Sequence, residues 1–534
     1  MSQLDLTFTP ASQQAVGGGL EGAAVTARET FSWNPAIISP DQQINRGKTL
    51  SDARGRDAVQ NDGYATGVVN THRDSIVGSQ YRLNAKPVFE LVGGDEDWAE
   101  EFQLVVENRF NLLADSAECW FDASGTKTLT DIIRLAIGGF VFTGEVLGTA
   151  EWLSKQPGRP FNTAFQMVAP IRLSNPNGLS DTEQLSGGVA MDAFGNPVGY
   201  HIRRCFPTDF FNPLLNEWKY VPAKKPWGRR QVIHIREQLQ PGQTRGVADM
   251  VSVLKQMRMT KKFQDITLQN AVVNASYAAA IESELPQDAV YQALGAGGTG
   301  IGELLGGYMT ALNSYVSASD NIAVDGVKIP HLFPGTKLNF KPMGTPGGVG
   351  TAFEESLLRH VAAALGMSYE QFSRDYSKTN YSSARASMAE TWKFMQSRKK
   401  LVADRLATSI YTLWLEEEIN AGHIPLPKGK TAAMFYDPVM REALVNCTWI
   451  GASRGQIDEL KETQSALLRI KSGLSTLEIE SARLGEDFRT LLRQRAREEK
   501  MLQKYGLHLD MGAEKPGANE RQKLMREEKE TDDE

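Results

Sequence analysis

One stretch of this chain constrains its fold more than any other, because residues 247–285 contain neither glycine nor proline. This run of 39 residues (247 to 285 inclusive) would span about 58 Å if it were wholly helical. Its apolar residues form a stripe through positions 250, 254 and 257, which then shifts to 259, 263 and 266. Pro286 closes the run, and helices of such length usually cross something or join two separate bodies. The sequence therefore predicts a long helix that carries a separate unit at its far end.

The residues after this helix predict that unit and the return of the chain. Residues 286–350 contain a glycine-rich stretch, a helix over 301–317 and strands in VKIPHLF and KLNFKPM. A helix over 351–365 then comes back, with apolar residues on one face. A polar loop at 373–387 precedes a second long helix that runs from Met388 to about Asn420. The basic cluster Arg398-Lys399-Lys400 interrupts the apolar stripe of that helix and marks a place for a bend or for an ion-paired, solvated face.

The flanking segments predict a mainly helical chain with one β-rich part. We expect helices over 49–76, with a break at Asn61-Asp62-Gly63, and over 97–113 and 129–144. Short strands and turns follow over 148–240, and VAMDAFGNPVGYHIRR (189–204) is typical of a hairpin around Gly195-Asn196. The last hundred residues are helical in pattern, and Ser475 with Glu478 predicts a capping box. The predicted fold class is thus α+β, mainly α.

Charge and composition limit the classes of function. The net charge of −6 points away from a protein that grips nucleic acid along its whole surface. The three cysteines are far apart, which argues against a disulfide framework or a zinc ribbon. The beginning of the sequence lacks the pattern of a secretion signal, and the best apolar stretch, 135–144, is too short for a bilayer span. We expect no membrane association.

Motifs for catalysis and cofactor binding receive no support. The glycines of residues 295–300 match G-x-G-x-x-G, but the residues before them are helical in pattern, where a dinucleotide site needs a strand. Gly429-Lys430-Thr431 resembles the end of a P-loop, yet Ile424 stands where that motif requires glycine, so a basic turn is favoured. The seven histidines form no metal-binding spacing. We expect no cofactor, no metal and no enzymatic activity.

Several runs of sequence resemble lambda-family portal proteins of tailed bacteriophages, in a consistent order over about residues 30 to 510. They are RDAVQNDGYATGVVNTHRDSIVGSQYRL (56–83), GVAMDAFGNPVGYHIRR (188–204), VIHIREQLQPGQTRGVADMVSVLKQM (232–257), YEQFSRDYSKTNYSSARAS (369–387) and CTWIGASRGQIDELKE (447–462). The predicted order of elements, with a long helix out, a small tip and a helix back, also resembles the portal fold.

The resemblance implies a division of the chain into the parts of a portal subunit. A mobile arm (1–30) would precede the wing (31–246), which holds the first helices and the β-rich part. The stem helix (247–285), the clip (286–350) and the returning stem helix (351–366) would follow. The tunnel loop (367–387) would lead into the long bent wing helix and its return (388–447). Crown helices (448–510) and a disordered charged tail (511–534) would complete the subunit.

The resemblance also implies partners. Portals of this family form closed rings, commonly of twelve subunits, at one capsid vertex, where double-stranded DNA enters and leaves without sequence-specific recognition. The ring would dock the terminase large subunit and later a head-completion or adaptor protein, and would contact the major capsid and scaffolding proteins. It would be assembled in the host cytoplasm. The alternatives are another virion head–tail adaptor, although adaptors are usually much shorter, and a nucleotide-dependent DNA-processing enzyme.

Two basic segments are the candidate sites. A channel must let DNA slide, so its lining should make few, weak phosphate contacts, and a loop that mixes basic with hydroxyl and amide side chains suits this role. We expect DNA contact, or alternatively a solvated loop in which Arg385 pairs with an acidic neighbour, for Arg374, Lys378, Thr379, Asn380, Tyr381 and Arg385. The stem cluster is expected to face the capsid or a neighbouring subunit, and comprises Arg258, Lys261 and Lys262.

Overall fold

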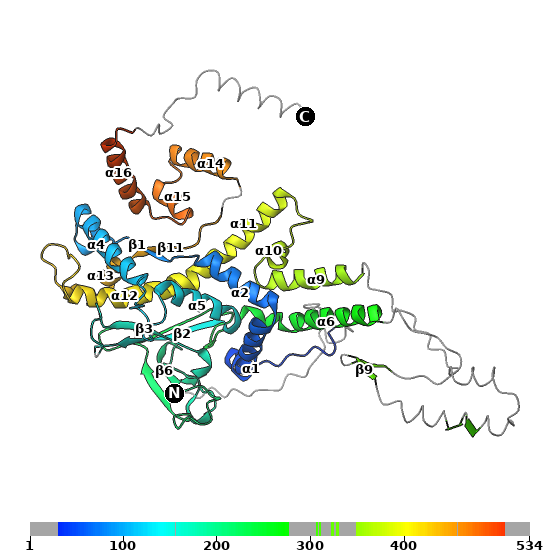
Figure 1. Cartoon of the computed structure of the whole chain (residues 1–534). Coiled ribbons are helices and arrows are strands. Elements are labelled where there is room, and N and C mark those ends of the chain that lie inside the picture. Colours follow the sequence, from blue (N-terminus) through cyan, green and yellow to red (C-terminus); the bar gives the residue numbers. More distant parts are fainter. Residues whose placement is uncertain are drawn as a thin grey trace, which may run out of the picture. The chain divides into compact units, whose positions relative to one another are not determined.

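The computed structural model describes residues 30–154, 156–276, 349–455 and 458–507, with short pieces at 306–307, 309–310, 322–324 and 327–329. The chain divides into two compact units. The first comprises Met1–Arg56, Thr71–Ala248 and Gln396–Glu534, and the second Asp57–Asn70 and Asp249–Met395. The described residues are mainly helical with several small sheets, as predicted for an α+β chain (Figure 1).

The helices before the β-rich part lie where the sequence predicts them. Helices α1 (Pro40–Asn61) and α2 (Gly63–Ile76) are separated at Asp62, whose side chain accepts a hydrogen bond from the Tyr64 amide at 2.9 Å. The predicted joint is therefore confirmed, although α1 begins nine residues earlier (49 − 40) than expected. The short helix α3 (Phe89–Val92) precedes α4 (Glu96–Ala114) and α5 (Leu129–Thr143). Thr128 and Asp131 form a capping box at the start of α5, which fixes where that helix begins.

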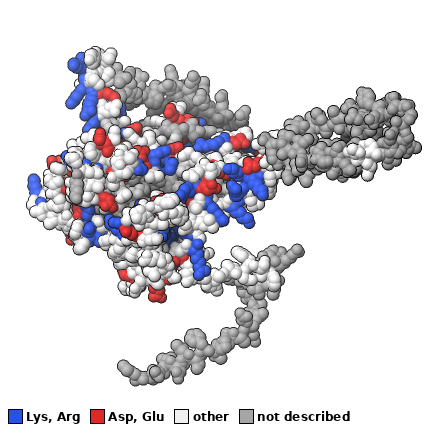
Figure 2. All heavy atoms as spheres, turned by 60° about the horizontal axis from the view of Figure 1, so that its bottom comes forward, with Lys and Arg blue, Asp and Glu red and all other residues white. Residues whose placement is uncertain are grey.

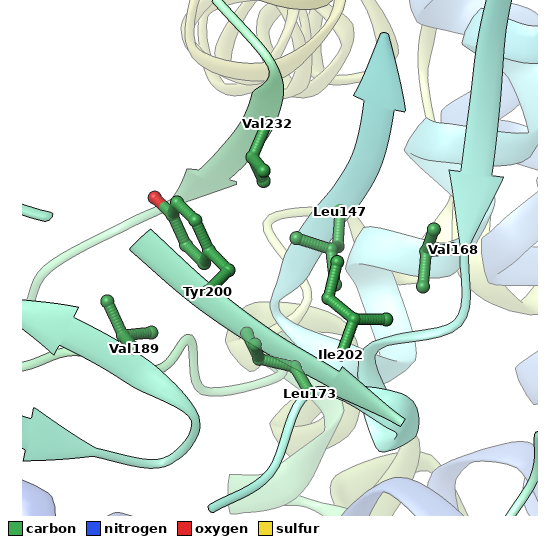
Figure 3. Packing of buried hydrophobic residues seen from close by; sticks show 7 residues of the cluster. All are labelled: Leu147, Val168, Leu173, Val189, Tyr200, Ile202 and Val232. Carbon is green, nitrogen blue, oxygen red and sulfur yellow. The ribbon is translucent and has the colours of Figure 1, made fainter. Parts of the chain in front are cut away.

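The β-rich part consists of two antiparallel sheets. One has the order β3-β2-β8, from β2 (Glu145–Trp152), β3 (Thr163–Val168) and β8 (Val232–Arg236). The other runs β4 (Leu185–Ser186), β5 (Val189–Met191), β6 (Pro197–Arg203) and β7 (Trp218–Pro222), and its β5–β6 pair is the predicted hairpin. Side chains from both sheets meet in one apolar cluster (Figure 3), made of Leu147, Val168, Leu173, Val189, Tyr200, Ile202 and Val232.

Helices α5 and α12 (Arg405–Asn420) contact the first sheet. On α12, Tyr411 and Trp414 are fully buried and pack edge-on against Phe110 of α4, with ring centroids 5.4 and 5.1 Å apart. The strand pair β1 (Arg82–Ala85) and β11 (Cys447–Ile450) joins segments far apart in the sequence, and neither strand was predicted from the sequence. The helices α13 (Pro438–Val445), α14 (Glu459–Lys471), α15 (Leu477–Arg483) and α16 (Phe488–Lys504) complete this unit.

The long helix after the polar loop changes its hydrogen-bond pattern at the predicted interruption. Helix α11 (Tyr381–Arg398) passes into a π-helical turn, Lys399–Asp404, and then into α12. Within this turn the Lys399 ammonium binds Asp404 and the carbonyl oxygen of Trp449, both at 2.9 Å. The basic cluster is therefore partly an ion-paired face, as one of the two interpretations of the sequence proposed.

A buried charge network fastens α1 to the sheets. The Glu145 carboxylate is wholly buried and accepts hydrogen bonds from Arg245 and from His234, while the Lys48 ammonium lies 3.5 Å away. Burial alone would raise the pKa of Glu145, but the guanidinium of Arg245 and the ammonium of Lys48 outweigh it and hold this pKa well below its usual range. Burial raises the pKa of Asp52, the other partner of Lys48, to about 6.

In the second unit the predicted long helix starts later than expected. Helix α6 spans Leu254–Ser276, and a 3-10 helix, Asp249–Ser252, precedes it. The chain at the start of the glycine- and proline-free segment packs in the first unit, because the backbone amide of Gly246 donates to buried Glu145 and Val247 lies against the backbone of Gly144. The expectation of a helix from residue 247 is therefore wrong for its first turns, and residues 277–285 lie outside the described part.

This unit also contains α9 (Val349–Ala364), α10 (Tyr369–Ser373) and a short antiparallel pair, β9 (Ile322–Val324) and β10 (Val327–Ile329). Helix α9 confirms the predicted returning helix. The predicted glycine-rich stretch, most of the helix over 301–317 and the strand in KLNFKPM lie outside the described residues, as do the arm before residue 30 and the tail after residue 507.

The predicted capping box at Ser475 is wrong. Thr476 is the N-cap of α15 and accepts the hydrogen bond from the Ile479 amide. The helix that follows is also shorter than expected, because the chain turns at Gly485 before α16 begins.

Candidate nucleic-acid interface

The loop between α10 and α11 is held by its two flanking helices. Gly366 has a φ of +67° that ends α9 in the left-handed region, and Ser368 then caps α10 by accepting from the Gln371 amide. Phe372 of α10 is 7% exposed and stacks on Tyr64 with ring centroids 5.2 Å apart. Helix α9 is fixed in turn to α6, because the side-chain NH2 of Gln264 donates a hydrogen bond to the Glu354 carboxylate at 2.5 Å. The loop therefore starts from a packed position.

The loop itself, residues 374–380, consists of short-range turns. Arg374 adopts a left-handed φ of +61°, and the Asp375 carboxylate accepts from the Ser377 amide at 2.9 Å. Hydrogen bonds from Ser377 lower the pKa of Asp375. The Thr379 amide closes a further turn on the carbonyl oxygen of Tyr376 at 3.2 Å. These bonds give the loop a defined backbone with exposed side chains.

The loop is shorter than the sequence indicates. Asn380 caps α11, since its side chain accepts from the Ser383 amide at 2.8 Å, and α11 begins at Tyr381. Residues 381–387, predicted as loop, are thus helical. Arg385 lies on this helix and is exposed, and among the described residues it has no ion-pair partner. The alternative in which Arg385 pairs with an acidic neighbour finds no such partner in the described part of the chain.

A carboxylate on α9 neutralises the basic side chain at the tip of the loop. Glu355 forms an ion pair with Lys378 and a second one with Arg359 at 3.3 Å, one helical turn along. The hydrogen bond to Glu355 raises the pKa of Lys378. The Arg359 guanidinium also lies over the ring of Tyr369, 5.1 Å from its centroid. We call Glu355, Arg359, Tyr369 and Lys378 the loop charge cluster.

Sequence reasoning missed three members of this cluster. Glu355 and Lys378 are 23 residues apart, so no local pattern connects them. Only the Glu355–Arg359 pair carries a signal in the sequence, because opposite charges four residues apart on a helix are neighbours.

The stem cluster is divided in the structure. Lys261 of α6 donates from its ammonium to the carbonyl oxygen of Asn61, the last residue of α1, at 2.6 Å. A lysine in this position donates a hydrogen bond to a carbonyl oxygen at the end of the helix, and its positive charge interacts favourably with the negative end of the helix dipole. Arg258 and Lys262 are exposed. On the face drawn in Figure 2, basic and acidic side chains are intermixed.

Other kinds of site have no basis in the described residues. No group of three or more His, Cys, Asp or Glu side chains in this part of the chain could hold a metal ion. None of the described helices is both long and apolar enough to cross a membrane. Gly429, with a φ of +77°, lies in a turn closed by the Lys430 amide and the carbonyl oxygen of Pro427, so the expected basic turn is confirmed. The glycines at 295–300 lie outside the described residues.

Comparison with known proteins agrees with the resemblance found in the sequence. The sequence profile described as "Phage portal protein, lambda family" matches residues 26–399. A portal protein of Escherichia phage N15 is 39% identical over 486 residues, which cover 90% of this chain and 88% of that protein. Portal protein B of Escherichia phage lambda is 38% identical over 468 residues, covering 88% and 86%. A chain from the virion of a native gene transfer agent particle matches with a TM-score of 0.37 and 13% identity, over 82% of this chain and 93% of its own length.

Proposed function

Because the chain belongs to the lambda family of phage portal proteins, we propose that twelve copies form a ring at one capsid vertex and conduct double-stranded DNA during packaging and ejection. The chain is a structural component of the virion and not an enzyme. ATP hydrolysis would belong to the terminase motor, which docks on the ring during packaging. A head-completion or adaptor protein replaces the motor afterwards, and capsid and scaffolding proteins surround the ring during assembly in the host cytoplasm.

The observation that carries the channel role is the neutralised loop cation. Lys378 has a side chain that is 70% exposed, yet Glu355 pairs with it. A ring would repeat any unpaired loop lysine once per subunit, and each phosphate that it neutralised would steepen the dependence of log K on log salt by about 0.9. A paired lysine binds phosphate more weakly, while the Thr379 hydroxyl and the side-chain NH2 of Asn380, whose oxygen caps α11, remain available for weak contacts. This combination suits DNA that must move.

The helices near the end of the chain support self-association. No residue of α14 or of α16 is buried within one copy of the chain. Their exposed apolar residues include Leu467 and Leu468 of α14 and Leu491, Leu492 and Met501 of α16. A soluble chain rarely leaves so many large apolar side chains in water. A neighbouring copy in a closed ring would cover them, through a heterologous interface.

The division of the chain proposed from the sequence needs one change. The tunnel loop is confined to residues 374–380, with Arg385 on the first turns of the wing helix. We retain the bounds of the wing (31–246), the stem (247–285 and 351–366), the clip (286–350) and the crown (448–510), with the first stem helix beginning at Leu254. For the stem cluster, capsid or neighbouring subunits remain the proposed contacts of Arg258 and Lys262, whereas Lys261 has an intramolecular role.

Deletion of residues 374–380 tests the proposal. We expect rings of normal mass, measured by native mass spectrometry, and impaired DNA packaging or retention. The reversal Lys378→Glu should have a milder effect than removal of residues 320–345 of the clip, which should abolish docking of the motor. Normal DNA packaging by the variant that lacks residues 320–345 would refute the assignment of residues 286–350 as the clip that docks the motor. Purified protein that stays monomeric under all conditions would refute the ring.

A further inference from the structure

The outer edge of β8 is largely unpaired in the described chain. Strand β8 is the last of the sheet β3-β2-β8, and on its other side only Ala223 accepts backbone hydrogen bonds, from the amides of Gln231 and Val232. In an antiparallel pair, alternate residues direct their backbone groups to the partner strand. The Ala150 amide of β2 donates to the carbonyl oxygen of Gln231, so residues 233 and 235 also face β2. The backbone groups of His234 and Arg236 therefore point outward.

The exposure of His234 shows that this edge is accessible. Its imidazole is 0% exposed and lies 3.0 Å from the Glu145 carboxylate, yet the residue as a whole is partly exposed. The exposed atoms must therefore belong to its main chain. His234 also lines a groove of about 740 Å³, which it can reach only through those backbone atoms. An N–H and a carbonyl oxygen are thus presented to the groove.

The groove has an apolar floor and a basic rim. Ile233 and Ile235 of β8 and Leu413 of α12 are buried along it. Its lining contains seven basic residues and four acidic ones. All four acids are already engaged in ion pairs, namely Glu237, Asp404, Glu416 and Glu442. The basic residues Lys224, Arg230 and Arg405 are exposed and form no ion pair within the described chain. The groove therefore fits an extended segment with apolar side chains and an acidic group.

Exposed sheet edges are normally covered, twisted away or blocked by charge, because they pair with any suitable strand. One segment of this chain outside the described residues has the required pattern. Gln3–Thr9 reads QLDLTFT, in which Leu4, Leu6 and Phe8 alternate with polar residues, and Pro10 ends the pattern. The last eight residues, EEKETDDE, are acidic and complement the basic rim of the groove, but they contain no apolar residue that could pack on its floor.

The chain leading to this segment starts near β8. Asp41 of α1 accepts a hydrogen bond at 2.7 Å from the amide of Thr244, eight residues beyond the end of β8. From Phe8 to Asp41 there are 33 residues (41 − 8), which can extend over about 110 Å at roughly 3.3 Å per residue. The length of the arm therefore allows it to reach the groove.

We propose that the amino-terminal segment Gln3–Thr9 adds to β8 as a further strand, with its backbone paired to His234 and Arg236. Its apolar residues would pack on the floor of the groove, and Asp5 would meet the basic rim. Strand addition takes its affinity from main-chain hydrogen bonds and its specificity from alternate side chains. This inference concerns one subunit surface and does not depend on ring formation.

Hydrogen–deuterium exchange tests the proposal on the full-length protein and on two deletion variants. The variant lacking residues 2–10 loses the proposed strand, and the matched control lacking residues 11–20 keeps it. We expect the amides within 231–238 to exchange about tenfold faster in the first variant and unchanged in the control. A synthetic peptide SQLDLTFTP added to the first variant should restore protection, whereas the peptide with Leu4→Ser, Leu6→Ser and Phe8→Ser should not.

Each outcome decides between the proposal and its alternatives. Equal exchange of 231–238 in the full-length protein and in the variant lacking residues 2–10 would overturn it. Faster exchange that the peptide does not reverse would also overturn it, since loss of the arm would then act through the fold. Protection restored equally by both peptides would show that charge, and not the alternating pattern, fills the groove, and it too would contradict the proposed strand.

Discussion

Removal of one carboxylate, in the variant Glu355→Gln, gives a sharp test of how the loop meets DNA. In the structure Glu355 holds both Lys378 and Arg359, whose side chains are 70% and 58% exposed. Glutamine keeps the shape of the side chain but loses its charge. Both cations then become available to phosphates, while the backbone turns of the loop, which do not involve Glu355, stay in place.

The magnitude follows from counterion release. Two additional phosphate contacts would steepen the slope of log K against log salt by roughly 1.8 for each subunit in contact with the duplex. Between about 50 and 200 mM salt, the affinity of the variant should then fall about twelvefold more than that of the wild type per contacting subunit. At low salt the variant should bind DNA more tightly, and in particles it should slow DNA movement.

The assay is fluorescence anisotropy of a labelled DNA duplex with the purified assembly over a series of salt concentrations. Glu370→Gln is the matched control, because Glu370 lies on α10 and forms no ion pair among the described residues. It changes the net charge equally but frees no cation, so its slope should stay close to that of the wild type. Equal slopes for Glu355→Gln and the wild type would refute the reasoning, because the loop cations would then not face DNA.

Three further variants, each with a control where the chain offers one, test the fold of the first unit. Burial raises the pKa of Glu107 from 4.5 to about 7, so the folded state loses stability as the pH rises from 4.5 through 7. The free energy of unfolding, measured by chemical denaturation, should therefore shift in favour of Glu107→Gln over the wild type by about 3 kcal/mol when the pH is raised from 4 to 8. A difference between the two proteins that is the same at both pH values would contradict this. Lys48→Met should cost about 3–5 kcal/mol, because it leaves the buried Asp52 carboxylate without its ion-pair partner and removes one of the cations near Glu145, which keeps Arg245, while Lys400→Met, at an exposed pair, should stay within about 1 kcal/mol. Gly144→Ala should give little soluble protein, because its Cβ would lie 2.2 Å from the carbonyl carbon of Val247, whereas Gly139→Ala on the same helix meets no atom within 4 Å and should express normally.

The sequence predicted elements well where the signal was local. The break between α1 and α2 follows from Asp62, which can bond to the backbone two residues on, beside a glycine. The β5–β6 hairpin follows from alternation around a glycine-containing turn. Helix ends were less well predicted, because Asn380 and Thr476 act as caps only through the backbone geometry that follows them.

The candidate site was predicted in its location and not in its chemistry. The polar loop before α11 is present, but its length was overestimated, because Tyr381–Ser387 satisfies both loop and helix patterns. The pairing of Lys378 depends on the ending of α9 at Gly366, which turns the chain so that Glu355 faces the loop. No periodicity in the sequence reports that distance.

The sequence by itself determined the order of long helices, the β-rich part, the basic loop and membership of the portal family, because hydrophobic periodicity, breakers and extended sequence similarity are properties of the chain read in order. Only the tertiary structure decided which charged side chains are neutralised by ion pairs and which strand edge has backbone groups without a hydrogen-bond partner in the described chain. Glu145 with Arg245, Glu355 with Lys378 and the free edge of β8 each depend on segments brought together by folding. Burial and distance set the energies of such groups, and both exist only once the chain has packed.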